Sequence, residues 1–554
     1  MNKKISVTFR SGEVKEFDVG VTLYEISKSF SQYYNYPILI GTVDNDLVEL
    51  SEKINRSCTV DFYDRSSEVG NQIYSRTTQF LLILAVKELF GDAAEVVIEH
   101  SIDKGYYCEI NGVEIDKPVV RNIEEKMHEL ANENLLIEKI SVSRLDAIKF
   151  FERKKQMDKV KVLKYISNTY INLYHTKNLY DYFYGKLAHT TGQINEFKLT
   201  YIKDNGFVLS HPTSYNPEFT FDYVHHQRLF DKFLDYTTWG RQIGISNASD
   251  LNSKISKGEA GNVIRLAEAY YNNQLAFISE EIAQNKNIKL VLIAGPSSAG
   301  KTTSCKKLAV NLESKGLKPH QISLDDYFYD RDKTPRLENG KLDTESLNAI
   351  DITLFNKQLM QLLNGERVEV PTYNFILGKR EYNGRYLQIG KDDIILIEGL
   401  HCLNEDLTMA IDRNLKYKIY ISPLTQLNID KHNRIHTSDT RKLRRIVRDN
   451  KYRGYGASQT LNMWEDIRDG EEKYIFPYQD DADAMLNSAL VYEIGVLKTY
   501  AEPLLFNVDE DDPIYPEALR LINFLRNFLP IPSEEVPNDS VLREFIGNSC
   551  FYKN

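Results

Sequence analysis

The chain has 554 residues, of which 42% are hydrophobic and 27% are charged, and its formal net charge is −10. This composition is typical of a globular protein, and the length predicts about three or four domains. The acidic balance disfavours a general grip on nucleic acid, and no apolar run in the sequence approaches the length of a membrane span. Five scattered cysteines without a CxxC pair indicate reduced thiols, so we expect a cytoplasmic protein without a cysteine zinc site.

The first 63 residues predict a small β-grasp domain. Apolar residues alternate at Ile5, Val7 and Phe9, which is typical of a strand with one buried face. Thr22 and Glu25 have the spacing of a capping box at the start of a helix. A hairpin followed by a helix and further short strands resembles the TGS domain found at the front of threonyl-tRNA synthetases.

A segment within residues 64–216, YSRTTQFLLILAVKELFGDAAEVVIEHSIDKGYYCEI, resembles the second additional domain of threonyl- and alanyl-tRNA synthetases. That resemblance implies an HxxxH pair on a helix, with a later cysteine and histidine, as a metal or catalytic set. Here Arg76 and Phe80 stand at the two histidine positions and Gly185 at the cysteine position, so only His189 remains. One ligand of four cannot make a zinc site, and we expect a fold kept without hydrolytic chemistry.

A helix-rich connector is predicted over residues 217–283, and a nucleotide-binding domain is predicted to follow it. Leu290 to Ala294 is an apolar run suited to a buried strand, and GPSSAGKT then fills the GxxxxGK[ST] template. In this template backbone N–H groups at the mouth of a helix bind phosphate, the lysine reaches the β and γ oxygens, and the threonine hydroxyl faces Mg²⁺. The predicted nucleotide-binding residues are Gly295, Pro296, Ser297, Ser298, Ala299, Gly300, Lys301, Thr302 and Thr303.

Two further predicted strands each end in a carboxylate. Residues 321–324 lead to Asp325, and residues 393–397 lead to Glu398. Because chemistry collects at the carboxyl edge of a parallel sheet, Asp325 can accept the proton of an attacking hydroxyl or hold the metal. Glu398 is expected beside the magnesium position. The sequence lacks an NKxD guanine-binding motif, which disfavours a GTPase.

A basic stretch follows a fourth predicted strand at residues 416–422. Its arginines lie three or four residues apart and therefore share one helical face, and Arg453 and Gly454 come directly after them. A solvated charged helix is the usual interpretation of such a run. We favour a mobile basic segment that closes over a phosphoryl group, neutralising charge and excluding water.

Six blocks in this half, GPSSAGKTT, LDDYF, LDTESLNAID, VEVPTYNF, IEGLH and RRIVRDNKYRG, resemble the uridine–cytidine kinase and phosphoribulokinase family of P-loop kinases. The similarity runs from about residue 288 to 500. It implies an α/β domain over residues 284–554, with a parallel sheet covered by helices on both faces, that binds ATP and Mg²⁺. The predicted fold is therefore an α/β P-loop kinase domain preceded by α+β domains.

The same resemblance assigns roles residue by residue. Asp325 matches the catalytic base; Lys301 matches the phosphate-binding lysine; Thr302 and Glu398, with Asp325, match the magnesium side; Asp343 matches the aspartate that holds the ribose hydroxyls; Tyr373 and Phe375 match aromatics lining the nucleoside pocket; Arg445 matches a substrate-side arginine; Arg448 and Arg453 match lid arginines at the ATP phosphates. For the two aromatic residues, ordinary core packing stays open as the alternative.

Three positions depart from the family pattern. Gly378, Tyr455 and Met463 stand where pyrimidine-nucleoside kinases carry groups that hydrogen-bond the base. A buried polar edge left unpaired costs about 1–3 kcal/mol, so these changes are expected to alter base preference. His401 in the IEGLH block leans toward the phosphoribulokinase side and keeps a sugar-phosphate acceptor open.

These observations predict an ATP-dependent kinase that phosphorylates the 5′-hydroxyl of a nucleoside whose base stays open. We expect it to bind a small-molecule substrate and no membrane, and a homo-oligomeric assembly remains an alternative. One alternative is a tRNA- or RNA-associated nucleotide switch that uses the synthetase-like front half; the acidic charge counts against it. An editing hydrolase is disfavoured by Arg76, Phe80 and Gly185.

Overall fold

The computed structural model describes residues 3–202, 206–336, 340, 342–425 and 427–552. The chain divides into two compact units. The first unit comprises Met1–Lys257, Gln426–His436 and Leu505–Leu529, and the second comprises Gly258–Thr425, Thr437–Leu504 and Pro530–Asn554. Two segments inside the predicted 284–554 domain therefore group with the front half of the chain.

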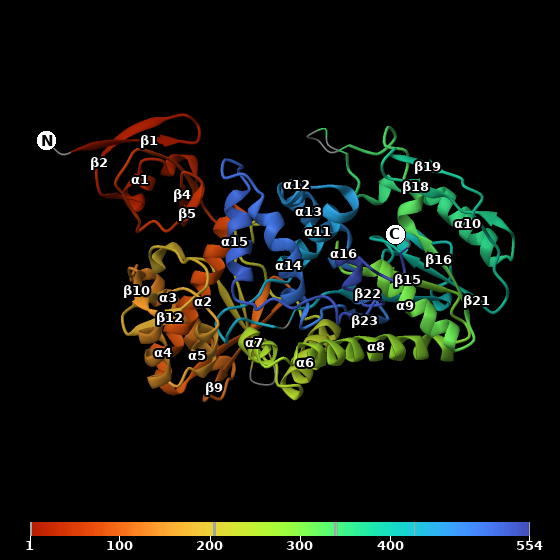
Figure 1. Ribbon diagram of the computed structural model, residues 1–554, viewed down its shortest axis with the longest axis horizontal. Helices are drawn as coiled ribbons and strands as arrows, with labels where there is room; N and C mark the ends of the chain where they lie inside the picture. The colour runs from red at the N-terminus through yellow and green to blue at the C-terminus, as the bar shows by residue number, and fades with distance from the viewer. Residues whose placement is uncertain (1–2, 203–205, 337–339, 341, 426, 553–554) are drawn as a thin grey trace. The chain divides into compact units, whose positions relative to one another are not determined.

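The first unit begins with the expected β-grasp, drawn in red in Figure 1. Its sheet has the order β2-β1-β7-β4-β5, formed by β1 (Lys4–Phe9), β2 (Val14–Asp18), β4 (Ile40–Val43), β5 (Asp46–Val48) and β7 (Cys58–Tyr63), and β3 (Val21–Thr22) pairs with β6 (Lys53–Ile54). Helix α1 (Leu23–Lys28) packs Leu23 and Ile26 into the core of this sheet. The predicted capping box is confirmed, since the Thr22 side chain accepts from the Glu25 N–H and the Glu25 carboxylate accepts from the Thr22 N–H.

The rest of the first unit is built around one long helix, α2 (Glu68–Phe90), whose middle is buried on all sides. A four-stranded antiparallel sheet has the order β13-β14-β9-β8, and a three-stranded sheet has the order β10-β11-β12. The strands of these two sheets are β8 (Glu95–Ile102), β9 (Gly105–Asn111), β10 (Glu138–Ser143), β11 (Tyr170–Thr176), β12 (Leu179–Tyr182), β13 (Lys198–Ile202) and β14 (Gly206–Ser210). The other helices of the unit are α3 (Lys117–Asn132), α4 (Arg144–Arg153), α5 (Met157–Lys164), α6 (Gln227–Gln242), α7 (Ala248–Ser256) and α15 (Tyr515–Leu525).

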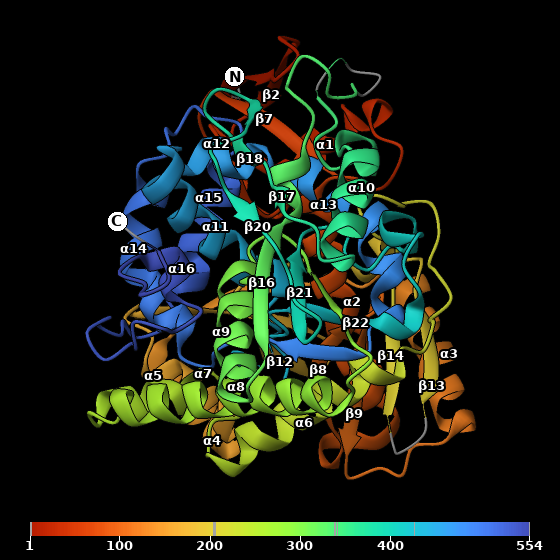
Figure 2. The same cartoon turned by 90° about the vertical axis from the view of Figure 1, so that its right-hand side faces the viewer.

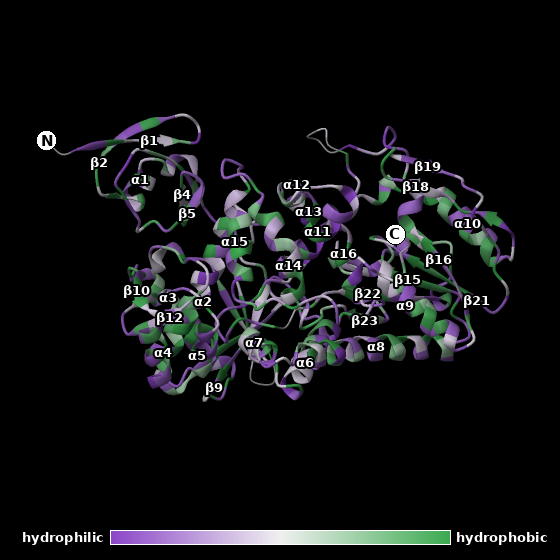
Figure 3. Ribbon diagram, in the orientation of Figure 1, coloured by the Kyte–Doolittle hydropathy of each residue, from purple (hydrophilic) through white to green (hydrophobic). Residues whose placement is uncertain are grey.

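The second unit begins with helix α8 (Ala260–Gln284), around which polar and apolar residues alternate (Figure 3). Its five-stranded sheet is parallel throughout, in the order β16-β21-β15-β22-β23, as the expected α/β fold requires. The strands are β15 (Leu290–Ala294), β16 (Lys318–Ser323), β21 (Asp393–Glu398), β22 (Lys416–Ser422) and β23 (Ala484–Asn487). Figure 2 shows β16 and β21 side by side, with α9 (Lys301–Ser314) along β16.

The second unit contains further helices and two short hairpins. The helices are α10 (Ile352–Leu363), α11 (Thr437–Arg453), α12 (Ala457–Asn462), α13 (Trp464–Tyr474), α14 (Glu493–Phe506) and α16 (Arg543–Ile546). The last two residues of α14 group with the first unit. In the hairpins, β17 (Val368–Glu369) pairs with β20 (Tyr386–Leu387), and β18 (Thr372–Asn374) pairs with β19 (Lys379–Glu381). Strand β16 ends at Ser323, one residue earlier than predicted, because Leu324 begins a 3₁₀ turn. Within the described residues, no helix has the length and apolarity that a membrane crossing requires.

Candidate active site

The loop between β15 and α9 has the backbone geometry of a phosphate cradle. Gly295 must be a glycine, because a Cβ there would overlap the carbonyl oxygen of Ile421. Gly300 is the N-cap of α9 and adopts φ 84°, in the left-handed region that glycine tolerates without strain. Ser298 also has a positive φ, 61°. The loop therefore turns its N–H groups toward the start of a helix, where an anion is stabilised.

Lys301 and Thr302 occupy the places that the sequence predicts for them. The Lys301 ammonium folds over the loop and donates to the carbonyl oxygens of Gly295 (2.8 Å) and Pro296 (3.2 Å). The Thr302 hydroxyl lies 3.4 Å from Oε1 of Glu398, which also accepts from Ser323 (3.1 Å). The phosphate-side lysine, the hydroxyl and the carboxylate thus meet at one edge of the sheet.

Asp325 faces the same group of charges. It lies in the 3₁₀ turn Leu324–Tyr327, directly after β16. Burial raises its pKa above the usual range, Asp326 raises it further, and the cations of Lys301, Arg453 and Arg448 act in the opposite direction. A buried carboxylate beside several cations can receive a proton and release it again, as a general base must.

Asp325 and Glu398 also act on each other. Burial raises the pKa of Glu398 to about 7, and the charge of Asp325 contributes to that rise. Two close carboxylates and the Thr302 hydroxyl form an oxygen donor set that suits Mg²⁺, which commonly binds one or two carboxylates together with phosphate oxygens. No cluster of three or more His, Cys, Asp or Glu forms a metal site among the described residues.

The predicted substrate-side arginine and the two predicted lid arginines converge on one buried carboxylate. Arg445, Arg448 and Arg453 on α11 form ion pairs with Asp449 at 3.2, 3.0 and 3.4 Å. Arg445 also donates to the Ser297 hydroxyl at 2.5 Å and therefore contacts the phosphate loop itself. These arginines are held in place by Asp449, and a phosphoryl group would compete with that residue for them.

The other two arginines of α11 support the loop. Arg441 pairs with Glu471 of α13 and donates to the Ser297 carbonyl oxygen (2.9 Å), while Arg444 pairs with Glu493 (2.6 Å) and is fully buried. The solvated charged helix considered for this stretch is therefore excluded. Its arginines divide into a buried pair that holds the loop and three that face the site.

Two carboxylates of the second unit already bind N–H groups of the cradle. Glu471 accepts from the Ser297 N–H at 2.9 Å. Glu544 of α16 accepts from the N–H (3.1 Å) and the hydroxyl (2.7 Å) of Thr303, and the Tyr552 hydroxyl lies 3.3 Å from the same oxygen of Thr303. Neither glutamate could be predicted as a partner of the loop, because both lie far along the chain in segments without a motif.

The residues predicted to bind the acceptor lie around a hairpin. The Tyr373 N–H donates to Asp326 (3.1 Å), and its ring packs edge-on against Phe328 and Phe375. The side chain of Phe375 is 56% exposed, so core packing does not explain this residue. At Gly378 φ is 64° and a Cβ would lie 2.8 Å from the Arg331 guanidinium, so a histidine has no room in this conformation.

The segment around Asp343 carries one residue that the sequence did not indicate. Asp343 accepts from the Ser346 N–H at 3.2 Å, which fixes the turn. Burial and the charge of Glu471 raise the pKa of Glu345 to about 7. His401 binds the Glu345 carbonyl oxygen through Nε2 (2.9 Å), and burial lowers its pKa to about 4, so it is a neutral side chain that positions this segment.

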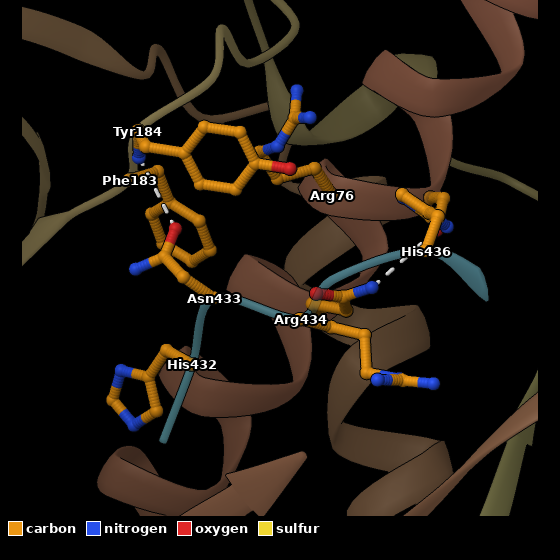
Figure 4. A pocket seen from close by; sticks show the side chains of 9 residues that line it. Arg76, Phe183, Tyr184, His432, Asn433, Arg434 and His436 are labelled. Carbon is orange, nitrogen blue, oxygen red and sulfur yellow. Dashed lines mark hydrogen bonds between the residues drawn. The ribbon is translucent and has the colours of Figure 1, made fainter. Parts of the chain in front are cut away.

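In the first unit, the residues at the positions of the synthetase metal set pack against other side chains. Phe80 is fully buried in the core, and the His189 ring packs at a tilt against Tyr24 with ring centres 4.5 Å apart. The guanidinium of Arg76 occupies the space that a side chain at Gly185 would need. The Arg76 side chain, drawn in Figure 4, therefore has room because residue 185 is a glycine.

A known protein family matches part of the chain. Residues 290–494 match the model of the family described as "Phosphoribulokinase / Uridine kinase family". This region is a phosphoribulokinase/uridine kinase family domain. Its fold is that of a P-loop kinase.

Two solved structures are similar to parts of this chain. One, from Bacillus stearothermophilus, is described as a possible uridine kinase; it is 22% identical, is covered over 79% of its length and 27% of this chain, and has a TM-score of 0.23. The other is a D-glycerate 3-kinase from Cryptococcus neoformans, 16% identical over 49% of this chain and 89% of that protein, with a TM-score of 0.21.

The front half is similar to threonine–tRNA ligases. The protein from Acetivibrio thermocellus is 29% identical over 200 residues, which are 35% of this chain and 31% of that protein. Threonine–tRNA ligase 2 of Bacillus subtilis is 31% identical over 201 residues, 36% of this chain and 32% of the ligase. The chain thus spans about a third of the length of these relatives.

Proposed function

We propose that this protein is a cytoplasmic kinase that transfers the γ-phosphoryl group of ATP to an alcohol, with a nucleoside 5′-hydroxyl as the acceptor. The observation that carries the proposal is the placement of Asp325 in the field of Lys301, Arg448 and Arg453. A P-loop alone would suit many nucleotide-binding proteins. A buried carboxylate opposite the phosphate-binding cations is what a phosphotransferase needs in addition.

Each residue has a definite task in this proposal. The Asp325 carboxylate receives the proton of the attacking hydroxyl. Lys301 leaves the carbonyl oxygens of its own loop for the phosphate oxygens, and Arg448 and Arg453 exchange Asp449 for the charge that develops on the transferred group. Thr302, Glu398 and Asp325 would hold Mg²⁺, which neutralises phosphate charge when bound.

The acceptor side supports a nucleoside through two features. The exposed aromatic pair Tyr373 and Phe375 offers ring faces for a flat base, and Asp343 lies on the preceding segment at the position matching a ribose ligand. Arg331 fills the place beside Gly378, so a base-reading histidine has no equivalent here. A purine or a modified base is therefore as compatible with the site as a pyrimidine.

The test is a screen with labelled ATP over nucleosides and sugar phosphates, using the full chain. We expect one nucleoside to be labelled, and we expect Asp325→Asn to lower turnover by about 10²–10⁴-fold. Asp393→Asn is the matched control, since Asp393 pairs with His320 (2.8 Å) at the opposite end of β21 from Glu398. If only sugar phosphates are labelled, the acceptor is a sugar phosphate and not a nucleoside. Full turnover in Asp325→Asn would overturn the mechanism.

A second candidate follows from the similarity to threonine–tRNA ligases, namely a tRNA-associated protein that uses its P-loop as a nucleotide switch. In that case the full chain would bind tRNA, and the affinity would fall steeply with salt. Filter binding at two salt concentrations distinguishes the candidates. We expect no salt-sensitive binding of tRNA, because the chain carries a net charge of −10.

A further inference from the structure

The segment 539–552, which we call the strap, lies against the first turns of α9 within the second unit. It contains α16, which packs beside α11 and the start of α9 (Figure 2). The side chains of Val541, Leu542 and Phe545 are fully buried. The strap also packs on the phosphate loop itself, because a Cβ at Gly300 would overlap Cγ2 of Val541.

The centre of the strap binds an N–H group at the start of α9. The first helical bond of α9 runs from the Ser304 N–H to the Gly300 carbonyl oxygen, so the Thr303 N–H needs a partner from outside the helix. Glu544 accepts from this N–H at 3.1 Å and from the Thr303 hydroxyl at 2.7 Å. The positive end of a helix stabilises a carboxylate there as it stabilises a phosphate. Glu544 therefore occupies an anion position of the loop.

The end of the strap contacts the same turn of α9 and the next residues along it. The Tyr552 hydroxyl lies 3.3 Å from the Thr303 hydroxyl, and the Lys306 ammonium lies 4.0 Å from the centre of the Tyr552 ring. Lys306 also donates to the Phe551 carbonyl oxygen at 2.8 Å. The contacts of Glu544 are thus reinforced by a hydroxyl, a ring and a carbonyl oxygen of the same segment.

The beginning of the strap is anchored by an ion pair. The Lys307 ammonium, whose residue is 5% exposed, lies 2.8 Å from the Asp539 carboxylate and donates to the Asp539 carbonyl oxygen at 3.1 Å. Lys307 stands one helical turn after Thr303, so this ion pair can be changed while the groups at the anion position stay intact.

A bound nucleotide and the docked strap need the same N–H group. In the GxxxxGK[ST] template, backbone N–H groups of the loop bind the nucleotide phosphates. A phosphate oxygen and the Glu544 carboxylate cannot both accept from the Thr303 N–H, and two anions at that distance repel each other. Docking of the strap therefore lowers the fraction of protein that is ready to bind a nucleotide.

We propose that the strap is an autoinhibitory segment, which docks on the start of α9 in the nucleotide-free protein and is displaced by a Mg²⁺-bound nucleotide. The proposal rests on the proposed function only in requiring that the loop binds a nucleotide. It does not depend on which alcohol accepts the phosphoryl group.

The test is hydrogen–deuterium exchange of the full-length protein with and without Mg·ADP, read by mass spectrometry. We expect slower exchange in residues 295–303, which reports nucleotide binding, and faster exchange in residues 539–552, which reports release of the strap. Protection of the loop with slower or unchanged exchange in the strap would overturn this proposal alone. Failure of Mg·ADP to protect the loop would overturn both the strap and the nucleotide site. A responding strap in a protein that labels no acceptor would overturn only the proposed kinase reaction.

Asp539→Asn loosens the strap at its ion-pair anchor. Calorimetry should show Mg·ADP binding up to about fivefold more tightly, the range for a partly exposed ion pair. Glu535→Gln is the matched control, since it also removes one negative charge from an ion pair, that with Arg265 (3.4 Å), but lies before the strap.

Unchanged affinity in Asp539→Asn would overturn the proposal, as would equal tightening in Glu535→Gln, which would indicate a general effect of charge. Cooperative unfolding by circular dichroism verifies that each variant folds. If Asp539→Asn does not fold, the exchange experiment on the parent protein decides the question.

Discussion

The loop between β15 and α9 in the second unit and the surroundings of the buried Arg76 and Arg434 in the first differ in where their positive charge lies. The loop is positive through backbone N–H groups at a helix start, and the carboxylates of Glu471 and Glu544 already bind two of those groups. In the first unit the positive charge lies on the side chains of Arg76 and Arg434, which contact a ring, a carbonyl oxygen and an amide. The first site is therefore set by the fold, and the second by a few residues.

This difference indicates how easily substitutions change each kind of site. A cradle made of main chain persists as long as Gly295 and Gly300 keep its turns. A site made of side chains changes its character with two substitutions that fit one another, as arginine at 76 and glycine at 185 do. The following changes test this contrast, from the largest expected effect to the smallest.

Lys301→Ala should have the largest effect, because Lys301 is the side-chain cation of the loop. Loss of one charge-stabilising donor lowers kcat by about 10²–10³-fold. The measurement is labelled phosphoryl transfer to the acceptor found in the screen. Lys315→Ala is the control, since Lys315 lies at the other end of α9 and pairs with Glu280; equal losses in both would contradict the role of Lys301.

Glu471→Ala should destabilise the second unit by about 3–5 kcal/mol, because it leaves Arg441 buried without its ion-pair partner. Urea unfolding followed by circular dichroism measures the change. The adjacent Glu472→Ala removes a partly exposed pair with Arg468 (2.8 Å) and should cost less than about 1 kcal/mol. Similar unfolding midpoints for the two variants would show that the carboxylate does not hold the loop.

Glu345→Gln should flatten the pH dependence of stability. Its folded pKa of about 7 lies above the ordinary 4.5, so between these values the folded state keeps a proton that the unfolded state has released. Stability is complete below pH 4.5 and is lost as the pH rises to 7, by up to about 3 kcal/mol. Unfolding free energies at pH 4.5 and 7 measure this slope. An unchanged slope in the variant would mean that other carboxylates cause it.

Glu544→Gln should have the smallest effect, a tightening of nucleotide binding by a factor of a few. The substitution removes a negative charge from the start of α9 and preserves the shape of the side chain. Affinity for Mg·ADP at low and high salt is the measurement, because screening reduces the gain at high salt. Weaker binding in the variant would indicate that the carboxylate supports the bound form of the loop.

Local patterns predicted the elements that the site needs. Apolar runs and the GxxxxGK[ST] spacing located β15 and α9, and the strand-then-carboxylate pattern located Asp325 and Glu398. These signals are readable because each lies within about ten residues and follows from strand, turn and helix geometry. The alternation in the first strand predicted the β-grasp in the same way.

Long-range partners could not be predicted from the sequence. Glu471 and Glu544 meet the loop only after about 170 and 240 residues of chain, and no periodicity marks a carboxylate that accepts from a distant N–H. Strand β23 is only four residues long and was not predicted. The division of the α11 arginines into supporting and site-facing residues also depends on Glu493 and Asp449, whose positions follow from packing.

The grouping of Gln426–His436 and Leu505–Leu529 with the front half has a practical consequence. The polypeptide crosses from one unit to the other several times, so a single cut after Lys257 would leave both excursions on a fragment that lacks their packing partners. Ile429 and Phe524, which are buried in the intact chain, would then be exposed to water. Separate expression of the halves therefore calls for short linkers that replace these excursions, and a simple truncation is expected to aggregate.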